Sequence, residues 1–414
     1  LGAVLTHCST DDRYLGDCHW MGGCLLGSDM LKWATWLMAF QALPPDPEAF
    51  GPGWREAWLA RLQALVPPAE LWLAHPLRDA YWDQGSVGRT PDAIRCPVMA
   101  TGGWADPYVD TVFRLARSVG ERLPFHGFVG PWSHVWPDAG LPGPAIGYWD
   151  LALAWFDRWL KDRPNGVDGW PRLRAYVQDS RPPDAAEVTV PGRWLATDGS
   201  GQPRPIRLRP EGMAEGAAAR GTAALPWDPR LGRQAGVWCP AGRPGDLPAD
   251  QAPDDARSLC LEAEEGALPE DLLGIPWLTL RLRPGGSLGQ VAARLCDVAP
   301  DGRSLLVSWG LLNLRRSGDF RADRALRPGA WIRRRLPLRA CGHRLAAGHR
   351  WRLALSASYW PHAWPGATAA QVEVDLQRLR LELPLIRAGA SRPSGEHDFG
   401  AAIAGAGSQA EGGR

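Results

Sequence analysis

Residues 94–106 read IRCPVMATGGWAD, and this stretch carries the pattern that decides the fold. A short apolar run ends in two glycines, and Asp106 follows them before a helical segment begins near Tyr108. Residues 126–134 read HGFVGPWSH and repeat the arrangement with His134 at the end. Short apolar runs that alternate with helical segments predict parallel strands covered by helices.

The same alternation extends to both sides of this stretch. Residues 1–8 predict a further strand, and apolar residues at helical spacing over about 21–90 predict a helical insertion broken by proline pairs. Residues 148–161 predict an amphipathic helix. Its expected apolar face comprises Trp149, Ala152, Trp155, Phe156, Trp159 and Leu160.

The second half of the chain has a different pattern. Leucines alternate with polar residues over 278–283 and again over 379–383, which predicts antiparallel strands with one solvated face. Several such runs imply a β-sandwich over about 170–387. Residues 388–414 are rich in Gly, Ala and Ser, and we expect them to be disordered.

Composition limits the classes of function. A length of 414 residues suits two or three domains, and a net charge of +1 gives no reason to expect nucleic acid as a partner. No stretch reaches the roughly 20 apolar residues of a membrane-spanning helix, so no membrane partner is expected. The eight cysteines show neither CxxC pairs nor zinc spacing, which favours free thiols, a cytoplasmic location, and no metal or cofactor. The sequence is also compatible with a homo-oligomer.

Asp106 and His134 carry the candidate chemistry. Neighbouring parallel strands end at the same edge of a sheet, so the two side chains are expected to come within hydrogen-bonding distance. A serine hydrolase uses such a pair, in which the acid orients the imidazole that takes the serine proton. In α/β-hydrolases the serine precedes the acid, yet Ser9, Ser28 and Ser86 stand in no G-x-S-x-G elbow. Ser287 does (residues 285–289), but it follows the acid and base, and its glycines indicate a hairpin turn between two strands.

Each residue also has a structural interpretation. Asp106 could serve as the N-cap of the helix that follows it, and His134 could be a packed side chain. His126 is a rival base, but it lies at the start of its strand, at the opposite edge of the sheet. Asp110 and Asp138 are rival acids that no glycine-flanked strand end presents.

Several motifs together resemble the CocE/NonD hydrolases, the relatives of cocaine esterase and of the S15 X-Pro dipeptidyl peptidases. Residues 96–106 (CPVMATGGWAD) resemble the acid segment of that family, 130–134 (GPWSH) its histidine segment, and 155–161 (WFDRWLK) the helix that follows. Residues 8–14 (CSTDDRY) with 21–23 (MGG) resemble the entry to its cap, and 294–302 (RLCDVAPDG) with 358–361 (SYWP) resemble its jelly-roll domain.

The resemblance implies a fold and a division of the chain. We expect the C-terminal portion of an α/β-hydrolase with a helical cap insertion, followed by a jelly-roll β-sandwich. The expected parts are a strand and cap entry (1–20), the cap (21–90), the part with the acid and base (91–165), the jelly roll (170–387) and a tail (388–414).

It also implies roles for residues. Asp106 would be the triad acid and His134 the base, while Tyr108, Trp132 and Trp20 would bind substrate. The nucleophile of the family, and the tyrosine that helps to form its oxyanion hole, would lie N-terminal to residue 1. We therefore expect a truncated or mis-started gene product that is inactive by the family mechanism as residues 1–414.

The preferred hypothesis is a serine hydrolase that cleaves a small-molecule ester or amide through an acyl-enzyme. Cap residues Met21, Trp33 and Trp36 are further candidates for contact with the acyl group, and core packing is the alternative for each. An aminopeptidase would need an acidic site for the substrate ammonium, for which Asp11, Asp12 and Asp17 are candidates. The competing hypothesis is a non-catalytic protein whose jelly roll binds a ligand such as carbohydrate.

Overall fold

Four parallel strands form the sheet that positions Asp106 and His134. In the computed structural model, which describes residues 1–211, 221–263, 270–316, 318–366, 371–386 and 392–393, the strands are β1 (Val4–His7), β4 (Val98–Gly103), β5 (Phe125–Gly130) and β6 (Leu173–Asp179). They lie in that order, and each pairs in parallel with the next. Every residue of β4 and β5 is buried, as expected for strands covered on both faces.

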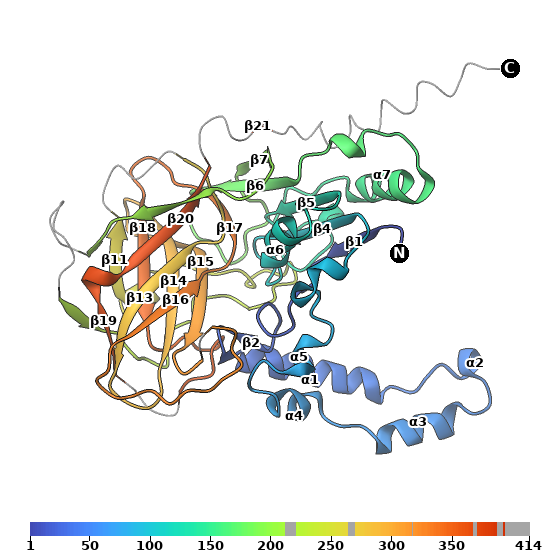
Figure 1. The fold of residues 1–414 in the computed structure, drawn as a ribbon, viewed down its shortest axis with the longest axis horizontal. Coiled ribbons are helices and arrows are strands. Elements are labelled where there is room, and N and C mark those ends of the chain that lie inside the picture. Colours follow the sequence, from blue (N-terminus) through green and yellow to red (C-terminus); the bar gives the residue numbers. More distant parts are fainter. Residues whose placement is uncertain (212–220, 264–269, 317, 367–370, 387–391, 394–414) are drawn as a thin grey trace.

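Two helices cover the opposite faces of this sheet (Figure 1). Val98 and Ala100 of β4 pack with α6 (Asp110–Ser118), whereas the intervening Met99 packs with α7 (Tyr148–Lys161). This is the period-2 alternation of a strand dividing its side chains between two cores. The predicted parallel sheet with covering helices is confirmed.

The buried face of α7 differs from the expected one. Trp149 and Leu160 were expected inside, but they are 53% and 57% exposed, while Tyr148 and Leu151 are fully buried. The buried residues Tyr148, Leu151, Ala152 and Trp155 follow helical spacing. The buried face of α7 is therefore shifted by about one residue from the predicted face. Apolar residues lie on both sides of this face, so the sequence pattern did not define its centre.

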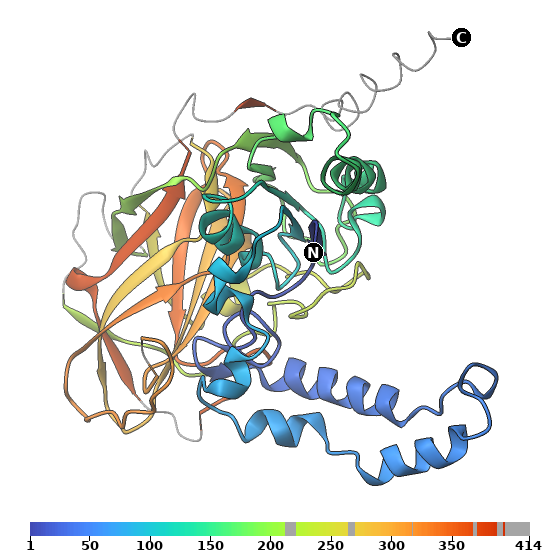
Figure 2. The same ribbon diagram turned by 45° about the vertical axis from the view of Figure 1, so that its right-hand side comes forward.

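The predicted helical insertion forms a cap with a projecting arm. It contains strands β2 (Trp20–Met21) and β3 (Cys24–Leu25) and helices α1 (Gly27–Ala42), α2 (Pro47–Phe50), α3 (Trp54–Gln63), α4 (Pro68–Leu73) and α5 (Ala80–Asp83), then the 3-10 turns η1 (Val87–Arg89) and η2 (Pro91–Ala93). Helices α1 and α3 extend together away from the rest of the molecule (Figures 1 and 2). Trp33 and Trp36 lie on α1 and are 41% and 49% exposed, so they belong to neither the core nor the strand ends.

The second half is a β-sandwich whose strands lie in two sheets. One is a five-stranded sheet in the order β15-β14-β18-β11-β9, and the other continues the parallel sheet through β6. Leu278, Leu280 and Leu282 are fully buried between the sheets, as their alternation predicts. The strands are β7 (Gly192–Thr197), β8 (Gln202–Ile206), β9 (Leu208–Pro210), β10 (Thr222–Ala224), β11 (Leu259–Ala263), β12 (Leu272–Gly274), β13 (Trp277–Pro284), β14 (Gln290–Val298), β15 (Ser304–Asn313), β16 (Ile332–Pro337), β17 (Cys341–Arg344), β18 (Arg350–Ser356), β19 (Val372–Asp375), β20 (Arg380–Leu385) and β21 (Arg392–Pro393).

Strand β6 joins the two halves of the molecule (Figure 1). It pairs in parallel with β5, and further along it pairs in parallel with β17 of the sandwich, where Gln178 lies opposite His343. The two halves therefore share one hydrogen-bonded sheet. The remaining short elements are α8 (Ala252–Asp255) and the turns η3 (Pro137–Ala139), η4 (Val167–Gly169) and η5 (Leu376–Arg378).

The loop with Ser287 is not the hairpin that its glycines suggested. It joins β13 to β14, and these strands belong to opposite sheets of the sandwich. Alternating strands with a short glycine-rich connection look alike in sequence whether the chain turns back in one sheet or crosses to the other. The tail expected over 388–414 lies outside the described residues, except that Arg392–Pro393 form β21, which pairs with β7.

All eight cysteines are free, as predicted. Within the described part of the chain, no helix has the length and apolar character needed to cross a membrane.

Candidate active site

Asp106 follows β4 directly and is completely buried. It does not cap the next helix: α6 begins at Asp110, and Val109 precedes it without a side-chain cap bond. The Asp106 amide donates to the Gly103 carbonyl (3.0 Å), and its own carbonyl accepts from the Arg339 guanidinium of the second half. The carboxylate is thus free for another partner.

That partner is His134, which follows β5. The His134 Nδ1 lies 2.9 Å from Asp106 Oδ1, and the imidazole keeps 41% of its surface exposed. The two loops are also joined through their backbones, since the Trp104 amide donates to the Gly130 carbonyl (2.9 Å) and the Ala105 amide to the Trp132 carbonyl (3.1 Å). The structure therefore brings the expected acid and base together.

Gly103 permits this close approach. A Cβ atom at that position would lie 1.9 Å from the Trp132 carbonyl oxygen, far inside van der Waals contact. The glycine pair of the acid segment therefore lets the backbones that precede Asp106 and His134 touch.

The electrostatics stabilise the charged form of the imidazole, which is the form that a base reaches once it has taken a proton. The hydrogen bond that the His134 ring donates to Asp106, and next the one with Cys239, raise the pKa of His134 to about 10, against an ordinary value of about 6.5. Burial opposes this shift, but the carboxylate outweighs it. A buried aspartate needs such a partner, because an isolated charge without one is costly to bury.

Two cysteines and a second histidine adjoin this pair, and sequence reasoning missed all three. Cys8 follows β1, and its ligand atom lies within 4.8 Å of those of Asp106 and His134. Cys239 comes from the second half, and the His134 amide donates to the adjacent Pro240 carbonyl (2.8 Å). His7 stacks on Trp136 with ring centroids 4.4 Å apart. Cys8 could have been found, because it follows a strand at the same sheet edge; Cys239 has no such signal.

Tyr108 lies beside the base, where a substrate-binding residue was expected. Its ring centroid is 5.5 Å from that of His134, and its ring lies nearly perpendicular to that of Trp238, with the centroids 5.7 Å apart. Its hydroxyl donates to Asp17 Oδ1 (3.0 Å), so this acidic residue of the cap entry reaches the site through Tyr108.

The other two expected substrate-binding residues are buried in cores. Trp132 is fully buried among the residues that pack on α7, and its indole donates to the Pro144 carbonyl (2.7 Å). Trp20 is 4% exposed and stacks on Tyr14 within the cap. Neither ring is exposed to a ligand in this conformation.

Two of the rival residues have structural partners. His126 lies near the start of β5, is 1% exposed, and forms a hydrogen bond with the Pro171 carbonyl. Burial is the main reason why its pKa lies well below the ordinary value. Asp110 accepts from the Ala340 amide (2.6 Å).

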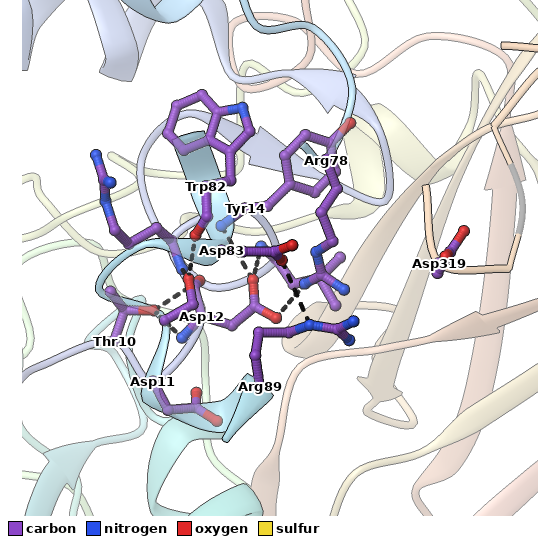
Figure 3. A network of polar contacts seen from close by, with 12 residues as sticks. Thr10, Asp11, Asp12, Tyr14, Arg78, Trp82, Asp83, Arg89 and Asp319 are labelled. Carbon is purple, nitrogen blue, oxygen red and sulfur yellow. Dashed lines mark hydrogen bonds and ion pairs between the residues drawn. The ribbon is translucent and has the colours of Figure 1, made fainter. Parts of the chain in front are cut away.

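Of the three acidic residues in the cap entry, two are committed to structure. Asp11 pairs with Arg114, and Asp12 binds Arg78 and the amides of Tyr14 and Leu15 (Figure 3). Asp17 differs, because among the described residues it meets no arginine or lysine. Its Oδ2 lies 3.6 Å from His19 Nδ1, and the Cys18 thiol forms a hydrogen bond with its carboxylate.

Two groups of side chains within the described residues could hold a metal ion. One is Cys8, Asp106 and His134, and the other is Asp17, Cys18 and His19. The second group consists of consecutive residues, so its proximity follows from the chain itself.

Comparison with known proteins identifies the family of the chain. Residues 1–136 match the model of the X-Pro dipeptidyl-peptidase (S15 family), and residues 165–395 match that of the X-Pro dipeptidyl-peptidase C-terminal non-catalytic domain. The chain is 23% identical over 314 residues to cocaine esterase from Rhodococcus sp. (strain MB1 Bresler), covering 69% of this chain and 53% of that protein. It thus spans about half the length of this curated relative.

Solved structures share the fold. An aminopeptidase from the marine sediment archaeon Thaumarchaeota archaeon matches with a TM-score of 0.66 at 19% identity, over 93% of this chain and 72% of its own. A CocE/NonD family hydrolase from Staphylococcus aureus matches with a TM-score of 0.67 at 12% identity, over 93% of this chain and 68% of its own. Both likenesses concern the α/β-hydrolase part together with the β-sandwich.

Proposed function

The chain belongs to the X-Pro dipeptidyl-peptidase (S15) family of CocE/NonD-type hydrolases, and from this premise we propose that Asp106 and His134 are the acid and base of a serine hydrolase. The substrate would be a carboxylic ester or amide, cleaved through an acyl-enzyme. Asp106 orients the imidazole and stabilises its charged form, and His134 takes the serine proton and returns it to the leaving group.

One observation carries the proposal: the 2.9 Å contact between His134 Nδ1 and a buried Asp106 Oδ1. It places the carboxylate on one side of the ring and leaves the imidazole partly exposed. A catalytic base needs this combination, because one nitrogen must be held while the other reaches the nucleophile.

The serine itself is proposed to come from outside these 414 residues. Among the described residues, no serine hydroxyl forms a hydrogen bond with the His134 ring. Strand β1 is the last strand at its edge of the sheet, and a cavity of about 610 Å³ beside it is lined by residues including Val4, Ser9 and Ile94. A further parallel strand beside β1 would end at the same sheet edge as His134 and could present a serine there.

Asp17 supports a substrate that carries an amine. It lacks a full positive partner among the described residues, it is 17% exposed, and Tyr108 links it to the surroundings of His134. A substrate ammonium group beside the acyl group would supply the positive charge that Asp17 lacks. The two groups would form a charge-assisted hydrogen bond, which is stronger than one between neutral groups.

The test uses the gene product translated with the DNA upstream of the Leu1 codon. We expect a fluorophosphonate probe to label a single serine there, and His134→Ala to abolish labelling and ester hydrolysis. Asp106→Asn should lower kcat by up to about 10⁴-fold while the protein stays folded. His75→Ala is the matched control, because His75 is a partly exposed histidine of the cap.

Labelling that persists in His134→Ala would overturn the assigned role. A product without any labelled serine would instead favour the non-catalytic hypothesis, in which the β-sandwich binds a ligand.

A further inference from the structure

Three potential metal ligands meet at the carboxyl edge of the parallel sheet, one after each of the strands β1, β4 and β5. They are Cys8 Sγ, a carboxylate oxygen of Asp106 and a ring nitrogen of His134, and all lie within 4.8 Å of one another. We infer that Cys8, Asp106 and His134 form a binding site for Zn²⁺. A thiolate, an imidazole and a carboxylate are a donor set that Zn²⁺ prefers, and the hard cations Mg²⁺ and Ca²⁺ avoid the thiolate.

The Asp106 carboxylate already contacts both of the other potential ligands. Asp106 is completely buried, its Oδ1 bonds the His134 ring, and the Cys8 thiol also forms a hydrogen bond with its carboxylate. A metal ion bound between these side chains would replace the thiol proton that now lies between Cys8 and Asp106.

Cys8 is held at this position by an unusual backbone. Its φ is +45°, in the left-handed region that residues other than glycine rarely adopt, and its amide donates to the Thr101 carbonyl (3.0 Å). Conformations of this kind persist where the surrounding structure imposes them, often at functional sites. Here the conformation places the thiol beside Asp106 and His134.

His7 contacts the Cys8 thiol but is not proposed as a metal ligand. Its Nε2 lies 3.1 Å from Cys8 Sγ and 3.1 Å from the Val135 carbonyl, and its Nδ1 lies 2.7 Å from Thr101 Oγ1. Both ring nitrogens are therefore engaged. A histidine so fixed can orient a thiolate ligand, as groups around metal ligands commonly do.

The fourth coordination position is assigned to Cys239 or to water. Cys239 contacts the His134 side chain, and the His134 amide bond to the Pro240 carbonyl fixes its loop there. Zinc sites with four protein ligands are closed and structural, whereas three ligands plus water leave an open site.

Zinc binding would compete with the proposed hydrolysis, and this consequence alone rests on the proposed function. A His134 ring nitrogen that binds the ion is lost either to the hydrogen bond with Asp106 or to the serine, so a bound ion would stop proton transfer. On binding, Cys8 gives up its thiol proton and the charged His134 ring gives up one proton, both to solvent, and His134 coordinates as neutral imidazole.

The site is tested on residues 1–414 by direct metal binding, which needs no hydrolytic activity. The metal-free protein is titrated with Zn²⁺ against a chromophoric chelator, and Co²⁺ is then used for its visible spectrum. We expect one ion per chain and a thiolate-to-cobalt charge-transfer band. Cys8→Ala should weaken Zn²⁺ binding by at least about tenfold and remove the band, since even residues that only orient ligands are commonly worth about 10–100-fold.

Cys96→Ala is the matched control. Cys96 is also a free cysteine, but it is buried and precedes β4, at the opposite edge of the same sheet. The Cys96→Ala variant should leave the affinity for Zn²⁺ and the cobalt charge-transfer band unchanged. Cys8→Gly serves as a second variant, because glycine accepts the positive φ and removes the thiol without strain.

The proposal is overturned if folded Cys8→Gly or Cys8→Ala binds Zn²⁺ as tightly as the parent chain. It is equally overturned if the parent shows no stoichiometric binding. In the Cys239→Ala variant, weaker binding supports the four-ligand form and unchanged binding supports the form with water. Zinc binding without inhibition of an active full-length enzyme would contradict the proposed role of His134, but not the metal site.

Discussion

The His134 amide donates a hydrogen bond to the Pro240 carbonyl oxygen over 2.8 Å. The candidate base is thus held by the second half of the chain, within the region that matches a C-terminal non-catalytic domain. Arg339 of the same half donates a hydrogen bond to the Asp106 carbonyl. The acid and the base are therefore each held by a contact with the second half of the chain. The β-sandwich therefore contributes to the geometry of the site, although it supplies neither the acid nor the base.

The charge state of His134 gives the first prediction. Because Asp106 raises the pKa of His134 to about 10, Asp106→Asn should lower that pKa toward its ordinary value of about 6.5. An NMR titration of the imidazole resonances measures both values. A His134 that already titrates near 6.5 in the parent chain would contradict the proposed coupling.

The same shift predicts a dependence of stability on pH. The folded-state pKa of His134 lies above its unfolded value, so the stabilisation from Asp106 is fully present below about pH 6.5 and is lost as the pH rises through about 10. The difference in denaturation midpoint between the parent and Asp106→Asn should therefore shrink between these limits. Urea unfolding at several pH values measures it, and a difference that grew with pH would have the wrong sign.

Asp17 leads to a prediction about specificity in an active full-length form. Asp17→Asn should lower kcat/KM for an α-amino ester by about 10–100-fold, the usual contribution of one hydrogen bond to a charged group. The matching ester without the amine should be affected little. Asp92→Asn is the control, because the Asp92 side chain is 91% exposed. An equal loss on both esters would assign Asp17 to structure only.

Gly103 leads to a prediction about how the acid and base are brought together. Gly103→Ala places a Cβ atom 1.9 Å from the Trp132 carbonyl oxygen, so the two loops must separate. The free energy of unfolding should fall by about 1–3 kcal/mol or more, and the pKa of His134 should decrease with it. Gly169→Ala is the control, since no atom lies within 4 Å of the added Cβ. Equal midpoints for the two variants in thermal unfolding would show that the close approach is not required.

Arg294 leads to a prediction for the sandwich. Its side chain is 2% exposed and lies 2.8 Å from Asp255 Oδ1, so Arg294→Met removes one of the two arginines that pair with this buried aspartate and leaves only Arg352. Removal of one partner of a buried pair commonly costs about 3–5 kcal/mol. Arg303→Met, at an exposed pair with Asp301, should leave the denaturation midpoint nearly unchanged. Urea unfolding measures the midpoints of the two variants. An equal decrease for Arg294→Met and Arg303→Met would contradict this account.

The part of the fold that depends on local patterns was predictable. The strands with Asp106 and His134, their parallel pairing, the α7 helix and the alternating strands β13 and β20 are all signalled by short-range periodicity. The connection that carries Ser287 was misassigned as a hairpin, because the sheet to which each strand belongs is decided by partners far away in sequence.

The sequence by itself therefore determined the order of strands and helices and the placement of an acid and a base at two neighbouring strand ends. Only the tertiary structure decided that Cys8 and Cys239 adjoin this pair, that Trp132 and Trp20 are buried in cores, and that β6 joins both halves in one sheet. The physical reason is the range of the interactions. Backbone periodicity acts over a few residues, whereas these contacts depend on how whole segments pack together, and the strand ends that bring Cys8 to Asp106 lie more than 90 residues apart in the sequence.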